Sequence, residues 1–181
     1  MRIVGGKYRH RLISFPDDMA HTRPTKDRIR EAIFSAIGDI SKARVLDLYA
    51  GSGAMGLEAL SRGASKATFV DVSPLAIKVI KDNISSLKIP DEEYEVIKNK
   101  DLQAIELFKD KGLKFDLVIL DPPYEQGEYE KIVDLLFTND LLSEKAIIVM
   151  ESNRKITLEN IEYQKNKEYH YGEIMVFIYW R

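Results

Sequence analysis

Hydrophobic residues recur along the chain in two patterns that alternate with each other. Short and almost continuous apolar runs, such as the one over residues 115–121, are separated by longer segments in which apolar positions return every three or four residues. The first pattern is typical of strands that are buried on both faces, and the second is typical of amphipathic helices. Their alternation predicts an α/β protein with a doubly wound, mostly parallel sheet that is covered by helices on both faces.

The pattern predicts seven strands and five helices. Strands are expected over residues 43–50, 66–72, 94–99, 115–121, 145–152, 163–172 and 173–181. Helices are expected over residues 26–39, 55–63, 73–87, 101–112 and 129–137, the third of them with Ser73 as its N-cap and Pro74 at its first position. Because no helix separates the last two strands, they should form an antiparallel hairpin at one edge of the sheet.

The two parts of the chain differ in charge. Residues 1–30 carry eight Lys or Arg and three Asp, a net charge of +5, whereas the remainder carries 19 basic and 26 acidic residues, a net charge of −7. We therefore expect a basic extension over residues 1–24, with a short ribbon that turns at Gly5-Gly6, before a main domain over residues 25–181. A basic arm on an acidic body indicates a polyanionic partner, although a solvated tail would have the same charge.

Composition excludes several classes of protein. With 181 residues the chain has room for one full domain and little more. The absence of cysteine excludes disulfides, thiolate catalysis and cysteine-based zinc sites, and the three histidines are too scattered for a metal site. No apolar run has the length of a membrane span, and the N-terminus lacks the apolar segment of a signal peptide. We expect a cytoplasmic, monomeric protein without a bound metal or a membrane partner.

Ligands of doubly wound sheets bind beyond the carboxyl ends of the strands, where the strand order reverses. After the first predicted strand, Gly51, Gly53 and Gly56 have the G-x-G-x-x-G spacing of a nucleotide-binding turn, in which backbone N–H groups face the ligand. The carboxylate of Asp71, about twenty residues further on, can accept hydrogen bonds from both hydroxyls of a ribose. These features suit NAD and S-adenosylmethionine equally.

Asp47 distinguishes between these two ligands. A carboxylate beside a pyrophosphate is repelled, whereas the ammonium group of S-adenosylmethionine is attracted to it, directly or through a water. The alternative is that Asp47 only caps the backbone of the loop. The sequence Asp121-Pro122-Pro123-Tyr124, at the end of the fourth predicted strand, is not part of a nicotinamide site. Both observations favour S-adenosylmethionine as the cofactor.

With these motifs, "DLYAGSGAMGLEAL" and "LDPPY", the chain resembles class I, Rossmann-like methyltransferases. The stretches "RIVGGKYRHRLI", "TRPTKDRIREAIF" and "YGEIMVFIYW" narrow the resemblance to the RsmD-type family, and it covers essentially the whole chain. Members of that family are bacterial enzymes that methylate a guanine N2 of small-subunit (16S) ribosomal RNA. The resemblance implies transfer from S-adenosyl-L-methionine to this exocyclic amine, with S-adenosyl-L-homocysteine as product. Asp71 replaces a common glutamate and Tyr49 a frequent phenylalanine, and we expect both departures to be neutral.

The resemblance and the strand ends together predict the site residues. In the catalytic set, the Asp121 carboxylate and the Pro122 carbonyl accept hydrogen bonds from the two amine hydrogens, and Tyr124 stacks on the base. In the cofactor set, Asp71 holds the ribose and Asp101 accepts from the adenine amine. The full catalytic set is Asp121, Pro122, Pro123 and Tyr124; the full cofactor set is Asp47, Tyr49, Ala50, Gly51, Ser52, Gly53, Gly56, Asp71, Val72, Asp101 and Leu102. Asn83 is expected to be an ordinary residue of a helix surface.

The partner implied by these features is ribosomal RNA or the assembling small ribosomal subunit. The residues expected to contact it are Lys7, Arg9, Arg11, Arg23, Lys26 and Arg30, although each could instead be a solvated surface charge. Other functions stay open. They are methyl transfer to adenine N6 of DNA or RNA, a non-catalytic RNA-binding module on the same fold and, disfavoured by Asp47, an NAD-dependent oxidoreductase.

Overall fold

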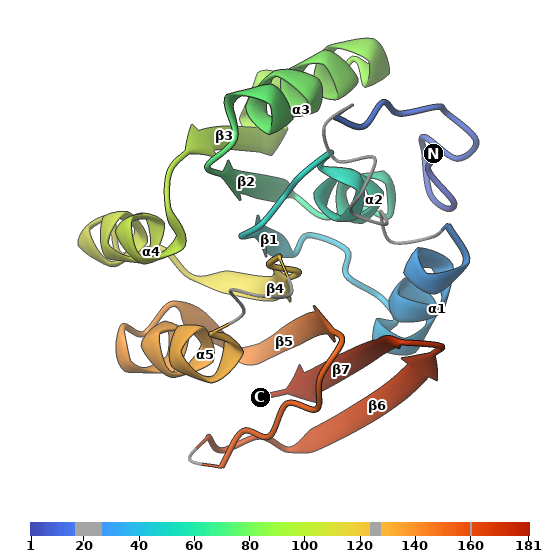
Figure 1. Cartoon of the computed structure of the whole chain (residues 1–181). Helices are drawn as coiled ribbons and strands as arrows, with labels where there is room; N and C mark the ends of the chain where they lie inside the picture. Colours follow the sequence, from blue (N-terminus) through green and yellow to red (C-terminus); the bar gives the residue numbers. More distant parts are fainter. Residues whose placement is uncertain (17–26, 124–127, 160) are drawn as a thin grey trace.

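The computed structural model describes residues 1–16, 27–123, 128–159 and 161–181 (Figure 1). Its elements in chain order are α1 (Asp27–Ile37), β1 (Arg44–Asp47), α2 (Ala54–Ser61), β2 (Lys66–Asp71), α3 (Pro74–Leu87), the 3-10 helix η2 (Asp91–Glu93), β3 (Tyr94–Lys98), α4 (Asp101–Asp110), β4 (Phe115–Leu120), α5 (Tyr129–Thr138), β5 (Leu142–Ser152), β6 (Lys165–Tyr171) and β7 (Ile174–Trp180). Each predicted strand and helix has a counterpart. The first helix ends earlier than predicted because Gly38 adopts a left-handed φ of +80°.

The seven strands form one sheet in the order β3-β2-β1-β4-β5-β7-β6. Strands β1 to β5 pair in parallel, whereas β7 runs antiparallel to both β5 and β6. The predicted fold class, including the C-terminal hairpin, is confirmed. The strand order reverses between β1 and β4, so the carboxyl ends of these two strands flank the position at which a doubly wound sheet binds its ligand.

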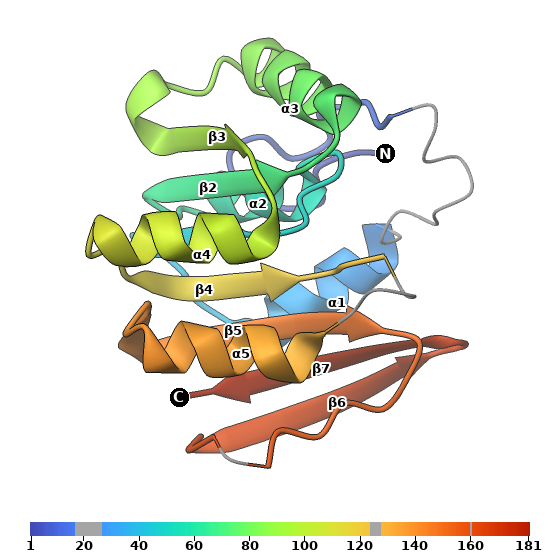
Figure 2. The same ribbon diagram turned by 60° about the vertical axis from the view of Figure 1, so that its left-hand side comes forward.

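Helices cover both faces of the sheet, and each face has its own hydrophobic core. Helices α1, α2 and α3 lie on one face, and α4 and α5 lie on the other (Figures 1 and 2). Along β4 the side chains alternate between the two cores, with Leu117 and Ile119 in the first and Val118 and Leu120 in the second. Burial on both faces is the reason why this strand is a continuous apolar run in the sequence.

The N-terminal arm, residues 1–16, packs against the domain. The predicted ribbon is present as a narrow antiparallel loop with a single isolated bridge, between Arg2 and Leu12. Ile3 and Ile13 are buried in the core that the arm shares with α1, α2 and α3. These residues are therefore part of the packed domain and not a solvated tail. The expected domain boundary after residue 24 lies outside the described residues.

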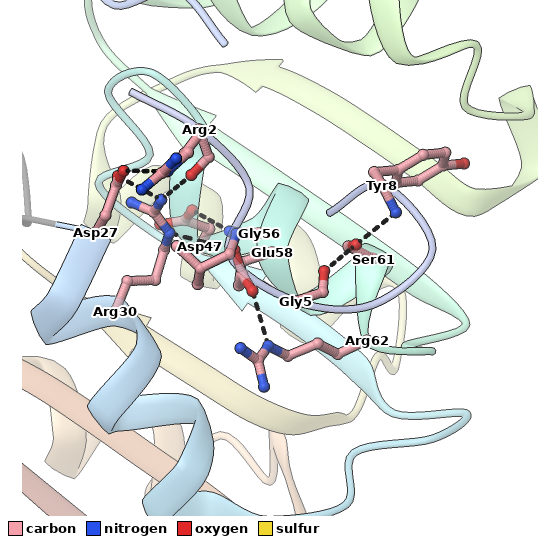
Figure 3. Close-up of polar contacts among 11 residues, drawn as sticks. Arg2, Gly5, Tyr8, Asp27, Arg30, Asp47, Gly56, Glu58, Ser61 and Arg62 are labelled. Carbon is pink, nitrogen blue, oxygen red and sulfur yellow. Dashed lines mark hydrogen bonds and ion pairs between the residues drawn. The ribbon is translucent and has the colours of Figure 1, made fainter. Parts of the chain in front are cut away.

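Contacts with Ser61 hold the turn of the arm against the end of α2 (Figure 3). The Tyr8 amide donates to the Ser61 hydroxyl (2.9 Å), and this hydroxyl donates to the Gly5 carbonyl. Gly6 has a φ of +74°, and a Cβ at this position would lie 1.8 Å from the Ser61 carbonyl oxygen. Only glycine allows the arm to approach the helix this closely.

A buried carboxylate joins the arm, α1 and α2. Glu58 has no exposed surface and accepts a hydrogen bond from the Val4 amide (2.8 Å). The same carboxylate pairs with Nε of the buried Arg30 (3.3 Å) and with Nε of Arg62 (2.8 Å; Figure 3). Removing one partner of a buried ion pair leaves an uncompensated charge, at a cost of about 3–5 kcal/mol. The position of the arm therefore depends on Glu58.

Candidate active site at the carboxyl ends of the strands

The turn between β1 and α2 uses its three glycines in different ways. Gly51 and Gly53 have φ angles of +54° and +77°, in the left-handed region that favours glycine. Gly56 lies within α2, and a Cβ there would come within 2.3 Å of Cε1 of Phe69 on β2. The first two glycines therefore shape the turn, and the third allows α2 to pack on the sheet.

Asp47 ends β1 and lies beneath this turn, with 3% of its surface exposed. Its Oδ2 accepts a hydrogen bond from the Gly56 amide in the first turn of α2 (3.0 Å; Figure 3). The N-cap residue of α2 is Gly53, which has no side chain, so Asp47 performs the capping role from the end of the strand. The structure thus shows the loop-capping role, and the contact with a cofactor ammonium stays a prediction.

The environment of Asp47 changes its ionisation. Burial raises the pKa of this carboxyl from 3.8 to about 7. The hydrogen bond from Gly56 opposes the rise, and the nearby carboxylate of Asp71 adds to it. At neutral pH the carboxyl is therefore divided between its neutral and charged forms. A cation placed beside it would favour the charged form.

Asp71 ends β2 and holds the same turn from the other side. Its Oδ2 accepts from the Gly51 amide (2.8 Å), and its Oδ1 accepts from the Ser73 amide (2.8 Å). Ser73 caps α3 as predicted, because its hydroxyl accepts from the Ala76 amide (3.2 Å). Each carboxylate oxygen of Asp71 has lone-pair capacity for another donor. The contacts to ribose hydroxyls stay a prediction that this geometry allows.

Tyr49 and Asp101 connect the turn after β1 with the start of α4. The Tyr49 hydroxyl donates to Oδ2 of Asp101 (2.8 Å), while Oδ1 accepts from the Leu102 amide (2.7 Å). Burial and the hydrogen bond to Asp101 raise the pKa of Tyr49, so its hydroxyl remains a donor. Tyrosine therefore differs from phenylalanine at this position by a hydrogen bond to Asp101, the residue that is predicted to accept from the adenine amine.

Apolar side chains accompany these acids. Val72 follows Asp71 and is 57% exposed, and Leu102 follows Asp101 and is 38% exposed. Exposed apolar groups beside hydrogen-bond acceptors suit a flat ligand with a polar edge, such as adenine. Ala50 is buried, and its amide is bonded to the backbone of β2, which leaves it a structural role in the turn.

Asn83 on α3 also belongs to this region, and the expectation that it lies on a helix surface is wrong. It is 3% exposed, and its Nδ2 donates to the Ser52 carbonyl in the glycine turn (3.0 Å). The same amide group pairs with the backbone of Ser14 in the arm. The available sequence signal was its position on the apolar stripe that contains Ile80 and Leu87.

Asp121 directly follows β4, across the switch point from the glycine turn. Asp47 is the register partner of Ile119, two residues before Asp121, so the ends of β1 and β4 lie side by side. The structure therefore brings the acids at the ends of β1, β2 and β4 to one edge of the sheet, as predicted. In the rest of the expected catalytic set, Pro122 is buried, Pro123 is exposed, and Tyr124 lies outside the described residues.

Three of the expected RNA contacts lie on the arm. Lys7, Arg9 and Arg11 are exposed. Lys7 pairs with Glu93 (3.0 Å), and Arg11 donates to the Ser86 carbonyl (2.7 Å). Such exposed contacts are weak, and a guanidinium has further donors, so all three side chains can still meet a phosphate.

A fourth expected contact, Arg30, does not lie on this exposed surface. Arg30 has no exposed surface and pairs with Glu58 (3.3 Å) and Asp27 (2.9 Å). Its positive charge is used inside the domain, and we leave it out of the RNA-facing surface. Arg23 and Lys26 lie outside the described residues.

The residues at the carboxyl ends of β1, β2 and β4 fit S-adenosylmethionine better than a dinucleotide. The carboxylates of Asp47 and Asp121 attract a cationic group and oppose a pyrophosphate, whereas Asp71 suits the ribose of either ligand. Within the described ranges, no cluster of His, Asp and Glu is arranged to hold a metal ion. Over the same ranges, no helix combines the length and the apolar character needed to cross a bilayer.

The fold and the residues at the carboxyl ends of its strands together define a class I, Rossmann-like methyltransferase. A solved structure from Escherichia coli, described as the putative methyltransferase yhhF, matches with a TM-score of 0.84 and 33% identity, covering 100% of this chain and 97% of that one. The putative methylase HI0767 of Haemophilus influenzae matches with a TM-score of 0.79 and 30% identity, covering 99% and 97%.

Sequence comparison identifies the family. The family described as conserved hypothetical protein 95 matches residues 1–180. The chain is 37% identical over 153 residues to ribosomal RNA small subunit methyltransferase D of Escherichia coli K12, which covers 84% of this chain and 74% of that protein. It is 34% identical over 159 residues to the putative rRNA methyltransferase YlbH of Bacillus subtilis, which covers 87% and 85%. The chain belongs to this RsmD-type family, as its motifs predicted.

The raised pKa of Asp47 predicts a pH dependence of stability. The carboxyl loses its proton near pH 4 in the unfolded chain but only at about pH 7 in the folded chain. The stability contribution is therefore complete below about pH 4 and is lost as the pH rises to about 7, by at most about 4 kcal/mol. Asp47→Asn should not show this loss. In urea titrations, the free energy of unfolding of Asp47→Asn should increase relative to that of wild type as the pH rises from about 4 to about 7. A constant difference between the two proteins over this range would contradict the prediction.

Proposed function

We propose that this protein transfers a methyl group from S-adenosyl-L-methionine to the exocyclic N2 amine of a guanine in small-subunit (16S) ribosomal RNA. The observation that carries the proposal is the meeting of two motifs at the strand switch point. These are the acid-supported glycine turn after β1 and Asp121-Pro122-Pro123 after β4. The RNA substrate is supported by relatives named as small-subunit ribosomal RNA methyltransferases. The guanine N2 target rests on the resemblance of the motifs to the RsmD-type family.

The cofactor is proposed to lie across the ends of β1, β2 and α4. Asp71 offers its oxygens to the ribose hydroxyls, and Asp101, oriented by Tyr49, accepts from the adenine amine. Val72 and Leu102 supply apolar contacts to the ring. When bound, S-adenosylmethionine supplies an electrophilic methyl group on a sulfonium, and its ammonium group is the cation proposed to meet Asp47.

The chain's own residues act on the amine. The guanine amine is a poor nucleophile because its lone pair is delocalised into the ring. The Asp121 carboxylate accepts a hydrogen bond from one amine hydrogen and the Pro122 carbonyl accepts one from the other, which favours a pyramidal nitrogen and offsets the positive charge that develops on it. The N–C bond would form as the S–C bond breaks, with S-adenosylhomocysteine as the leaving group and the amine proton passing to Asp121 or to solvent. Methyl transfer is an in-line displacement, so holding the nitrogen in position is the main contribution. Tyr124 is proposed to stack on the base.

Other functions have less support. Transfer to adenine N6 uses the same amine chemistry, but the relatives that state a substrate name ribosomal RNA. A non-catalytic RNA-binding module would not require both the glycine turn and the Asp-Pro-Pro sequence. An NAD-dependent oxidoreductase is opposed by the carboxyl group of Asp47 beneath the glycine turn.

The activity can be tested by tritiated methyl transfer to 16S ribosomal RNA that lacks the modification, followed by nucleoside analysis. We expect labelled N2-methylguanosine. Asp121→Ala should bind S-adenosylhomocysteine within about two-fold of wild type but lose at least about 100-fold in turnover, because it removes an interaction of the transition state. Asp134→Ala, on the exposed face of α5, is the matched control and should retain both properties. Labelled N6-methyladenosine, or no label in RNA, would contradict the proposal.

The ammonium contact of Asp47 has its own test. Because the pKa of Asp47 is about 7 in the free protein, a ligand cation that favours the charged form should release about half a proton on binding at pH 7. The affinity for S-adenosylhomocysteine should therefore rise between about pH 6 and 8, and Asp47→Asn should reduce this rise. Calorimetry in buffers of different ionisation enthalpy measures the proton release. Equal release by both proteins would leave Asp47 only its capping role.

The RNA-facing arm is best tested by a point substitution, because deleting residues 1–11 would remove Ile3 from the core. Arg9→Glu should weaken RNA binding and lower the slope of log affinity against log salt by about 0.7–0.9, the value of one phosphate contact. The affinity for S-adenosylhomocysteine should not change. Lys167→Glu makes the same change of charge on β6, which is the edge strand next to β7, and serves as the control. Equal effects of both substitutions would show a non-specific response to charge.

A further inference from the structure

Asn83 is a polar residue within the apolar stripe of α3. The stripe includes Ala76, Ile80 and Leu87, and Asn83 is 3% exposed among them. A buried amide destabilises the fold unless its hydrogen bonds are made. The partners of Asn83 therefore indicate what this residue does.

The amide of Asn83 joins two segments that are far apart in the sequence. Its Oδ1 accepts from the Ser14 amide (2.8 Å) and its Nδ2 donates to the Ser14 carbonyl (2.9 Å), which imitates the pairing of neighbouring strands. Its Nδ2 also donates to the Ser52 carbonyl (3.0 Å). One side chain thus connects the arm, 69 positions away, with the glycine turn, 31 positions away.

Each of the two segments is also held at the residue that precedes the contact with Asn83. Ser52 follows Gly51, whose amide is held by Asp71 (2.8 Å). Ser14 follows Ile13, which is buried in the core. Through the Asn83 amide group, a shift of the arm at Ser14 would reach the Ser52 peptide directly. The contacts that Glu58 and Ser61 make with the arm lead to α2 instead. The basic residues Lys7, Arg9 and Arg11 lie on the same arm.

We propose that Asn83 is a positioning residue that couples the cofactor turn to the RNA-facing arm, so that each ligand raises the affinity of the other. The inference rests on the proposed function, because it takes the turn to hold the adenosyl cofactor and the arm to hold RNA. A ligand that favours one position of the linked backbone at one end also favours the matching position at the other end. The coupling is reciprocal, so both ligands must show the same factor.

Coupling is measured as the ratio of the S-adenosylhomocysteine affinities with and without saturating unmodified 16S ribosomal RNA. In wild type we expect a ratio of at least about five. Asn83→Leu, of similar size, removes all three hydrogen bonds and should bring the ratio within about two-fold of unity. Ser86→Ala is the matched control. The Ser86 hydroxyl bonds the Asn83 backbone carbonyl (2.9 Å) and not its amide, so the ratio should stay at the wild-type value.

A second variant decides the matter if Asn83→Leu does not fold. Ser14→Pro removes the amide hydrogen that Asn83 accepts and fixes φ at this position, but it leaves both Nδ2 bonds, to the residue-14 carbonyl and to the Ser52 carbonyl, in place. It should keep the affinity for S-adenosylhomocysteine without RNA and reduce the coupling ratio below the wild-type value. The inference is overturned if the coupling persists in the folded variants, or if the wild type binds both ligands without coupling. Neither result affects the proposed function. A wild type that binds no S-adenosylhomocysteine overturns the proposed function instead.

Discussion

The hydrogen bond from the Gly56 amide to the carboxylate of Asp47 is the interaction on which the site depends. The turn after β1 needs a left-handed residue at Gly53, and a glycine there has no side chain to cap α2. The strand that precedes the turn supplies the cap in its place. Asp71 and Asn83 then hold the turn at Gly51 and Ser52, so its backbone is fixed before a ligand arrives. A preformed turn avoids part of the ordering cost of binding.

The same arrangement places acids close together in a partly dry environment. Burial and the neighbouring Asp71 raise the pKa of Asp47, which means that its charged form is disfavoured in the protein alone. A cationic ligand group would relieve this cost, whereas a diphosphate would increase it. An acid that weakens the fold at neutral pH would thus favour a cationic ligand over an anionic one. Such a balance is common where pKa values are perturbed at functional sites.

The basic residues among the first 30 positions have two different roles, which the net charge of this segment cannot distinguish. Part of its positive charge faces solvent, at Lys7, Arg9 and Arg11. The charge of Arg30, which follows the arm in the sequence, is consumed in the interior by Glu58 and Asp27. Gly6 and Ser61 keep the arm on α2, so its exposed cations are presented from a fixed position. If the arm binds RNA as proposed, its packed state lowers the conformational entropy lost on binding relative to a free tail.

The sequence by itself determined the order of the elements, the doubly wound sheet, the turn at Gly51 to Gly56 and the acids at the strand ends. These features follow from interactions within a few residues, because side-chain periodicity and glycine conformations are local properties. Only the tertiary structure decided which polar residues have a buried partner and which face solvent. Arg30 and Glu58 meet across 28 positions, Tyr49 and Asp101 across 52, and Ser14 and Asn83 across 69. A polar side chain finds such partners only after the helices have packed on the sheet, when burial requires that its hydrogen bonds be made.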